Sequence, residues 1–344
     1  MKSNQHPSIS VIMSVYNGEL YLNESINSIL KQTFQDFKFI ITDDCSTDNS
    51  LSIIEKYMQD DDRIILMKNK ENFGLTKNLN RMLAIASGKY IARMDADDIS
   101  LPTRFEKQYE YLEKYPEIGV LGTNISFFGI SKHITSLPVD NEKIRVALLF
   151  ENVIMHPSVM IRISVLTDNK LTYDESFKIS QDYDLWCRLQ QKTKFNNLKD
   201  VLLRYRFENY NITNSTSKDY RNSYLKQIFS NQLNTLGIEP TDKELLMHIA
   251  FSKGKPMISF EDVIVLKKWL LNILQYNRKY KIYKESTLEY TISRYWFVIC
   301  TSSTNLGFGI FKNYYTLKLK NRYKPSCLLF FKFFIKSLVK YGKR

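Results

Sequence analysis

Three carboxylates lie within four residues, at Asp95, Asp97 and Asp98, shortly after the apolar stretch 90–92. Acids crowded this closely repel one another, so protonation is favoured unless a positive charge sits between them. Oxygen ligands on a turn suit Mg²⁺ or Mn²⁺, and such an ion commonly bridges carboxylates to the phosphates of a substrate. The run therefore indicates a divalent-metal site; the alternative interpretation is a solvated acidic turn.

Two other expected strands also end in polar groups. The apolar segment 8–16 runs into Tyr16 and Asn17, and the segment 37–42 stops at Asp43 and Asp44. Apolar spacing predicts the elements between and after them. We expect helices over 19–32, 48–59 (capped by Ser46 or Thr47), 76–87 and 102–115, and strands over 63–67, 90–95 and 118–128.

This alternation of strands and helices is typical of a parallel, doubly wound α/β sheet covered by helices. Ligands of such sheets bind outside the carboxyl ends of the strands, so one crevice is expected to collect all three polar strand ends. The first strand is followed by neither a GxGxxG turn nor a Walker lysine loop. Dinucleotide binding and P-loop chemistry are therefore not expected.

The second half of the chain has a different character. We expect a helix over 140–150, a strand over 156–161, a helix from Gln181 and a last strand over 195–206. These are followed by amphipathic helices near 219–236, 241–252 and 260–275. We expect two parts, a catalytic domain over 1–215 and a helical, basic region over 216–344.

Charge is unevenly spread along the 344 residues, whose net charge is +13. Residues 1–200 hold 24 Lys and Arg against 27 Asp and Glu, whereas residues 201–344 hold 25 against 9. Such asymmetry indicates an anionic partner for the second half: a membrane surface, a nucleic acid or a polyanionic substrate.

The last twenty residues place Lys332, Lys336 and Lys340 at every fourth position among bulky apolar side chains. A helix there would resemble one that lies on a membrane surface, and its apolar runs are too short to span a bilayer. The alternative is a helix packed on its own domain, with its lysines solvated.

Four dispersed cysteines with no CxxC pair argue against a zinc site or a disulfide framework and suit a reducing compartment. The apolar run 9–15 is short and contains two serines, which favours a strand over a signal peptide. We expect a cytoplasmic protein, peripheral on the inner face of the cytoplasmic membrane.

Over about residues 8–206 the chain resembles the inverting glycosyltransferases of family 2, which have the GT-A nucleotide-diphospho-sugar transferase fold, so the resemblance implies a doubly wound mixed sheet. Within that family it looks most like bacterial enzymes of capsule, exopolysaccharide or lipopolysaccharide synthesis. The resemblance lies in six segments that follow one another in the family's order. They are SVIMSVYN (10–17), DDCSTD (43–48), NFGL (72–75) with Asn78 and Asn80, the run 88–98 ending in DADD, HPSVM (156–160) and QDYDLW (181–186).

The resemblance implies how a UDP-sugar donor is bound. Tyr16 matches the residue whose ring stacks on the uracil, and Asp44 matches the carboxylate that accepts the uracil N–H. Asp43 would orient the turn. As alternatives, Tyr16 is a half-buried tyrosine at a strand end, and the two acids belong to a capping turn.

The resemblance also implies a diphosphate site at the DxD motif. Asp97 would hold the Mn²⁺ or Mg²⁺ ion, Asp95 the ribose or the water shell of the ion, and Asp98 would have a structural role. Lys77 and Arg81, on the helix after the glycine turn, are candidates to reach the same phosphates.

Asp182 matches the family's catalytic base, which takes the proton of the acceptor hydroxyl; the alternative is a helix N-terminal acid favoured by the dipole. Here the sequence departs from the usual Glu-Asp pair, because Gln181 replaces the Glu, and this puts acceptor choice and the pKa of Asp182 in doubt. Trp186 is a candidate for the acceptor site, with core packing as the alternative. His156 is expected to be a structural hydrogen-bonding residue more than a metal ligand.

The C-terminal third matches no motif of the family. Its basic and aromatic character suits a lipid-linked saccharide acceptor, and Arg206 is a candidate to contact an anionic carrier or the donor diphosphate. Nucleic acid is not the expected partner.

Two other functions compete with this interpretation. A sugar-phosphate nucleotidyltransferase would need a Gly-rich, basic loop after the first strand, which residues 17–19 do not supply. A nucleic-acid- or membrane-binding protein without catalysis would explain residues 201–344 but not the acids at three strand ends.

Overall fold

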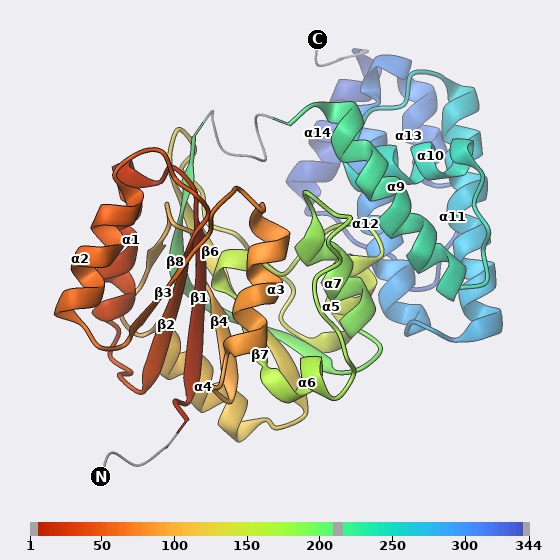
Figure 1. The fold of residues 1–344 in the computed structure, drawn as a ribbon. Coiled ribbons are helices and arrows are strands. Elements are labelled where there is room, and N and C mark those ends of the chain that lie inside the picture. Colours follow the sequence, from red (N-terminus) through yellow and green to blue (C-terminus); the bar gives the residue numbers. More distant parts are fainter. Residues whose placement is uncertain (1–5, 209–215, 340–344) are drawn as a thin grey trace. The chain divides into compact units, whose positions relative to one another are not determined.

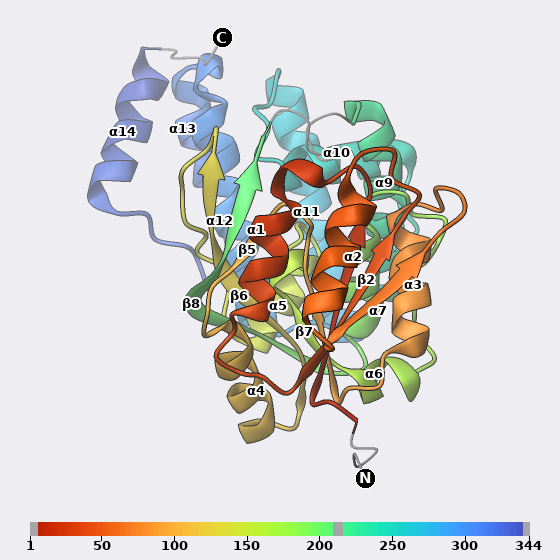
Figure 2. The ribbon, with the colours of Figure 1, turned by 60° about the vertical axis from the view of Figure 1, so that its left-hand side comes forward.

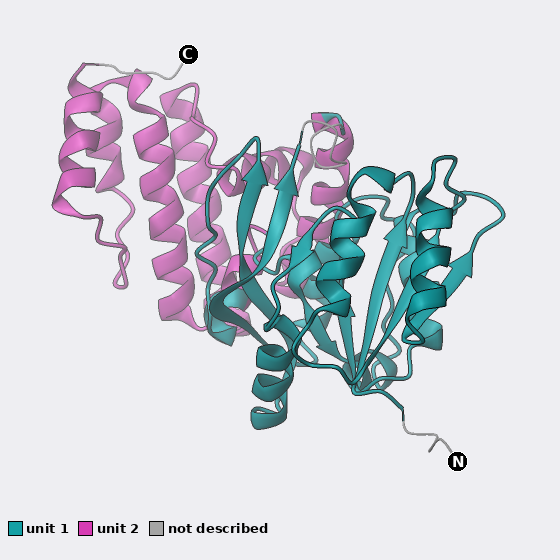
Figure 3. Cartoon of the chain, turned by 90° about the vertical axis from the view of Figure 1, so that its left-hand side faces the viewer, with its two compact units in different colours: residues 1–144, 152–217 teal, residues 145–151, 218–344 magenta. Residues whose placement is uncertain are grey.

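The computed structural model describes residues 6–208 and 216–339. The chain forms two compact units (Figure 3). The first comprises residues 1–144 and 152–217, and the second comprises residues 145–151 and 218–344. The second unit therefore takes in the end of α5 (Asn141–Leu148), a helix that begins in the first.

The first unit is built on one eight-stranded sheet of order β3-β2-β1-β4-β7-β6-β8-β5. Its strands in chain order are β1 (Ile9–Val15), β2 (Phe37–Asp43), β3 (Ile64–Lys68), β4 (Tyr90–Arg93), β5 (Ile99–Ser100), β6 (Ile118–Gly129), β7 (Met160–Arg162) and β8 (Lys194–Phe207). Helices cover both of its sides: α1 (Glu19–Leu30) and α2 (Ser50–Asp60) lie on one and α3 (Leu75–Ile85) on the other (Figure 1).

The doubly wound, mixed α/β sheet with covering helices that the resemblance implies is confirmed, although the alternation of strands and helices alone indicates only its parallel part. Strands β3, β2, β1 and β4 run parallel, whereas β7 is antiparallel to both β4 and β6, and β5 is antiparallel to β8. A parallel neighbour requires a crossover that returns the chain to the opposite end of the sheet. The connection between β6 and β7 begins and ends at the same end of the sheet, so these two strands are antiparallel and the sheet is mixed.

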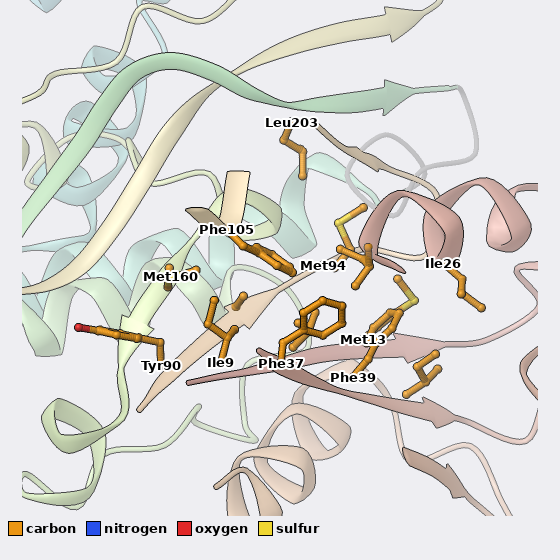
Figure 4. Close-up of a cluster of buried hydrophobic side chains, with 14 of the residues drawn as sticks. Ile9, Met13, Ile26, Phe37, Phe39, Tyr90, Met94, Phe105, Met160 and Leu203 are labelled. Atoms are coloured by element: carbon orange, nitrogen blue, oxygen red, sulfur yellow. The ribbon is translucent and has the colours of Figure 1, made fainter. Parts of the chain in front are cut away.

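Strands β1, β2 and β4 are mostly apolar because both of their faces are buried. On one face Met13, Phe39 and Met94 pack with Ile26 of α1 and Phe105 of α4 (Arg104–Lys114) in one cluster (Figure 4). This packing holds the carboxyl ends of the central strands in place, and the candidate site lies there.

Three local predictions need correction. Helix α2 begins at Ser50 and is not capped by Ser46 or Thr47: Asp48 Oδ1 accepts a hydrogen bond from the Ser50 N–H at 2.9 Å. Pro102 does not open α4, which starts at Arg104 after the short strand β5. The segment 156–158 is a 3₁₀ turn rather than the start of a strand, since Pro157 has no N–H for a ladder.

The second unit is helical. It contains α9 (Lys218–Thr235), α10 (Asp242–Ser252), α11 (Phe260–Tyr280), α12 (Glu285–Ser302), α13 (Phe308–Tyr314) and α14 (Cys327–Leu338) (Figure 2). Thr241 and Ser259 begin α10 and α11 with capping boxes, in which the cap side chain and the third helical residue satisfy each other's N–H groups. Within the described residues, every helix is too short or too polar to cross a bilayer.

Candidate active site

Three strand ends bring the candidate residues to one edge of the sheet. Val15 pairs with Asp43, and the Asp44 N–H donates to the Val15 carbonyl at 2.8 Å. On the other side of β1, Ile12 pairs with Arg93, and the Met94 N–H donates to the Ile12 carbonyl at 3.1 Å. Tyr16, the Asp43–Asp44 turn and the acidic run therefore follow three adjacent parallel strands.

The acidic run forms a cluster of oxygen ligands. One carboxylate oxygen from each of Asp95, Asp97 and Asp98 lies within 4.8 Å of the others. Burial and the neighbouring Asp95 charge raise the pKa of Asp97 to about 6. Asp98 Oδ2 is buried and has no hydrogen-bond partner among the residues that the structure describes. Clustered carboxylate oxygens are hard donors that fit a divalent cation.

Arg93 is a residue of this site that the sequence analysis missed. It is buried and forms an ion pair with Asp95, and its charge also lowers the pKa of Asp182. Its Nε and Nη1 atoms are buried without a hydrogen-bond partner in the described part of the chain. One cation therefore acts on both the acidic cluster and Asp182. The available signal was an arginine inside an otherwise apolar, buried strand.

Arg206 stabilises the acidic turn from β8. Its Nε donates to the Asp97 carbonyl at 2.9 Å, and its backbone N–H donates to Asp98 Oδ1 at 2.8 Å. The guanidinium carbon lies 3.8 Å from the centre of the Tyr21 ring, and the guanidinium group is ion-paired with Glu24. These contacts make Arg206 a positioning residue for the turn.

Asp44 organises the loop between β3 and α3. It accepts hydrogen bonds from Asn69 Nδ2 at 2.7 Å and from the N–H groups of Phe73 at 2.8 Å and Gly74 at 2.9 Å. Burial alone would raise the pKa of Asp44, but these bonds and one from Asn78 outweigh it and lower the pKa. Both of its oxygens are engaged with the protein.

Asp43 differs from its neighbour. Its Oδ2 accepts from the Ser46 N–H at 3.2 Å, as expected of a residue that orients the turn. Its Oδ1, however, is buried and has no partner within residues 6–208 and 216–339. Tyr16 stands beside this pair with 52% of its surface exposed, so its ring is accessible for stacking.

Lys77 and Arg81 both lie against the same loop. The Lys77 ammonium is 4.0 Å from the centre of the Phe73 ring, and the Arg81 guanidinium carbon is 5.2 Å from it. Arg81 also donates to Asn69 Oδ1. Lys77 is exposed, so its side chain can leave the ring for an anion, whereas Arg81 is tied to the loop.

Asp182 lies in the first turn of α7 (Gln181–Leu189). Burial raises its pKa, while a 2.7 Å hydrogen bond from Asn152 Nδ2 and the Arg93 charge lower it. A carboxylate whose pKa is raised toward neutrality is suited to take a proton. Gln181 beside it is buried. Asn152 was not foreseen, because nothing in its local sequence marks it as a partner of Asp182.

Trp186 and His156 lie in the core next to α7. Trp186 is fully buried, with ring centroids 6.0 Å from His156 and 6.5 Å from Phe195. His156 Nε2 shares a 2.8 Å hydrogen bond with the Tyr173 hydroxyl, and burial lowers its pKa well below the usual value. His156 is therefore neutral, and it does not belong to the group of clustered oxygen ligands formed by Asp95, Asp97 and Asp98.

Comparisons with known proteins agree with this architecture. Residues 10–166 match the family model described as glycosyl transferase family 2. An uncharacterized glycosyltransferase of Methanocaldococcus jannaschii is 39% identical over 234 residues, covering 66% of this chain and 76% of that protein. The O-antigen biosynthesis glycosyltransferase WbnJ of Escherichia coli is 34% identical over 206 residues, covering 58% and 80%.

Two solved structures share the fold at low sequence identity. S. aureus TarS in complex with UDP-GlcNAc has a TM-score of 0.58 and 19% identity over 90% of each chain. The mannosyltransferase PcManGT from Pyrobaculum calidifontis, in complex with GDP-Man and Mn²⁺, has a TM-score of 0.53 and 14% identity over 80% of this chain and 76% of that one. The expected GT-A-like fold is confirmed.

Proposed function

The chain belongs to glycosyl transferase family 2, and from this premise we propose that it transfers a hexose or N-acetylhexosamine from a UDP-sugar to a hydroxyl of a growing surface polysaccharide. Relatives named for O-antigen, amylovoran and teichuronic acid biosynthesis support this class of acceptor. A structural neighbour that binds UDP-GlcNAc supports the donor class.

We propose that the donor lies along the edge formed by β2, β1 and β4. The uracil stacks on the exposed Tyr16 ring, and its N–H is bound by the acidic pair, with Asp44 as the residue matched by the family motif. Asp43 Oδ1, which lacks a partner within the described residues, is the second acceptor available to the base. Lys77 swings from Phe73 to the diphosphate.

Asp97 and Asp95 are proposed to hold the divalent cation, Mn²⁺ or Mg²⁺. The support is the oxygen cluster at the end of β4 and the Mn²⁺ named with the mannosyltransferase neighbour. When bound, such an ion neutralises charge that develops on the leaving diphosphate. Arg206 holds the acidic turn in shape through the Asp97 carbonyl.

Asp182 is proposed as the general base. It takes the proton of the acceptor hydroxyl as that oxygen bonds to the anomeric carbon, and the bond from this carbon to the diphosphate oxygen breaks with its electron pair. Attack opposite the leaving group inverts the sugar configuration. Asn152 holds the carboxylate through its 2.7 Å hydrogen bond.

The organisation of the whole chain is part of the proposal. Residues 1–215 carry catalysis, and the helical region 216–344 serves a lipid-linked acceptor at the inner face of the cytoplasmic membrane. The boundary falls beside residues 209–215, which lie outside the described part of the chain. Support comes from the basic character of this region, with 25 Lys and Arg against 9 Asp and Glu over 201–344.

One observation carries the proposal: the acidic cluster and Asp182 are brought within the reach of one buried cation, Arg93. The test is release of UDP from a panel of UDP-sugars with Mn²⁺, in the presence and absence of EDTA. Asp182→Asn and Asp97→Asn are compared with Asp60→Asn, an exposed acid on α2.

We expect EDTA and either site variant to abolish release, while Asp60→Asn has no effect. Nuclear magnetic resonance of the product is expected to show the anomeric configuration opposite to that of the donor. Release that persists undiminished in Asp182→Asn would refute the assigned base. Tight, salt-sensitive binding to DNA with no turnover of any donor would favour a binding protein instead.

A further inference from the structure

Helix α14 presents bulky apolar side chains to solvent. Leu328, Phe331, Ile335 and Leu338 recur at helical spacing and are between 41% and 62% exposed. We call these four residues the outer α14 face. A surface helix of a globular protein normally turns polar residues outward. Contiguous exposed apolar residues of this size mark an interaction site.

The opposite side of α14 is fixed within the helical unit, where the helix lies beside α13 (Figure 2). The Phe311 ring centre is 5.2 Å from those of Phe333 and Phe334, and the Phe297 ring centre is 5.7 Å from that of Phe333. Ser326 caps the helix by accepting from the Leu329 N–H. The helix therefore cannot rotate to bury its outer face without losing this aromatic packing.

The charged side chains of α14 and of the segment that leads into it all have one sign. Lys332 is exposed next to Phe331, and Lys318, Lys320 and Lys324 are exposed on the segment that leads into the helix. Residues 290–344 contain eleven Lys and Arg and no Asp or Glu. An anionic surface complements this patch, and two copies meeting through it would bring their lysines together.

We propose that the outer α14 face binds the surface of an anionic lipid bilayer, with its apolar side chains at the acyl boundary and Lys332 among the headgroups. The helix has 12 residues, whereas spanning takes about 20, so it lies along the surface. This surface belongs to the helical unit, whereas every residue assigned to donor binding or catalysis belongs to the first unit.

Flotation of the full chain with lipid vesicles tests the proposal. Vesicles of phosphatidylcholine alone are compared with vesicles that also contain phosphatidylglycerol. Binding is expected to be at least about tenfold tighter to the anionic vesicles and to weaken with added salt, since each lysine near an anionic surface favours binding about fivefold.

Two variants separate the apolar and the charged contributions. The triple variant Leu328→Ser/Phe331→Ser/Leu338→Ser is expected to bind vesicles more than about tenfold more weakly, because the apolar side chains that would be buried in the bilayer are gone. Lys332→Gln is expected to lose about fivefold on anionic vesicles only. The matched controls are Leu246→Ser/Ile258→Ser and Lys268→Gln, exposed residues of the same unit, which are expected to bind as wild type.

Circular dichroism of each variant checks that it is folded, and UDP release with a soluble acceptor is expected to be unchanged. Failure of that release in the wild type would count against the proposed function and not against this surface. Vesicle binding by the triple variant equal to wild type would overturn the inference. So would a wild-type dimer in analytical ultracentrifugation that the triple variant dissociates, since a second copy would then cover the face.

Discussion

Replacing Asn152 tests the proposed base through its pKa. Asp182 must be ionised to accept a proton. Asn152 Nδ2 stabilises the ionised form by donating a 2.7 Å hydrogen bond to Asp182 Oδ2. Burial already raises the pKa of Asp182, and the amide opposes this rise. In Asn152→Ala the opposition is lost, so the pKa rises further and the acidic limb of the kcat/KM profile moves to higher pH.

The size of the shift follows from the hydrogen bond. A hydrogen bond to a charged group contributes about 1.5–3 kcal/mol, and one pKa unit corresponds to about 1.4 kcal/mol. Because Asp182 is only partly buried, water replaces some of the lost hydrogen bond. We therefore take the lower end of this free-energy range. The acidic limb is expected to move up by about one unit, with about a tenfold loss of kcat/KM well below the limb and little change on the plateau.

Asn152→Asp is the sharper variant. It keeps the oxygen that accepts from the Ile154 N–H at 3.2 Å but replaces the donor with a like charge. The limb is expected to move further up than in Asn152→Ala, because a neighbouring carboxylate disfavours a second ionised one. Asn169→Ala serves as the control, since it removes a 2.9 Å hydrogen bond from a side-chain amide, here to the Val165 carbonyl.

The assay is UDP release measured across pH at low substrate for the wild type and the three variants. An unmoved limb in both Asn152 variants, with rates lowered equally at every pH, would mean that Asn152 acts only on folding and that Asp182 does not set the limb. A downward shift in Asn152→Asp would refute the electrostatic reasoning directly.

Three further results are expected. Asp97→Asn should weaken Mn²⁺ binding by about tenfold or more in calorimetry, because it removes one of three clustered oxygen ligands. Asp44→Asn should destabilise the first unit by about 1–3 kcal/mol in urea unfolding and weaken UDP binding, since the loop N–H groups lose acceptors. His248 is buried and neutral: its Nε2–H donates to the Leu149 carbonyl, its Nδ1 accepts from Trp269, and burial lowers its pKa from 6.5 to about 4. Its contribution is present above pH 6.5 and lost as pH falls toward 4, so the wild type should lose about 2 kcal/mol by pH 5 that His248→Gln does not lose, as followed by tryptophan fluorescence.

Much of the first unit could be predicted because its signals are local. The run Ile9–Val15 is apolar at every position but two serines, which indicates a strand buried on both faces. Apolar spacing likewise indicates the helix α3, although it ends at Ile85 and not at residue 87. The oxygen-ligand cluster was also predictable, since its three acids lie within four residues and the turn alone brings them together.

The direction of β7 was not predictable in this way. Residues 160–162 look like any short buried strand, and whether they run with or against β4 depends on where the preceding connection ends. The same limit applies to Trp186, which the sequence places on a helix but which only the packing of Phe195 and His156 puts in the core.

The sequence by itself determined the family segments, the turn of three clustered acids and the basic, lysine-bearing end of the chain, because each depends on residues that are neighbours along the backbone. Only the tertiary structure decided that Arg93 serves both Asp95 and Asp182, that Asn152 holds Asp182, and that Arg206 supports the acidic turn. Asp182 is far in sequence from both Arg93 and Asn152, and Arg206 is far from Asp97. Hydrogen bonds and charges act through space, so these contacts exist only once the sheet has brought its strands together.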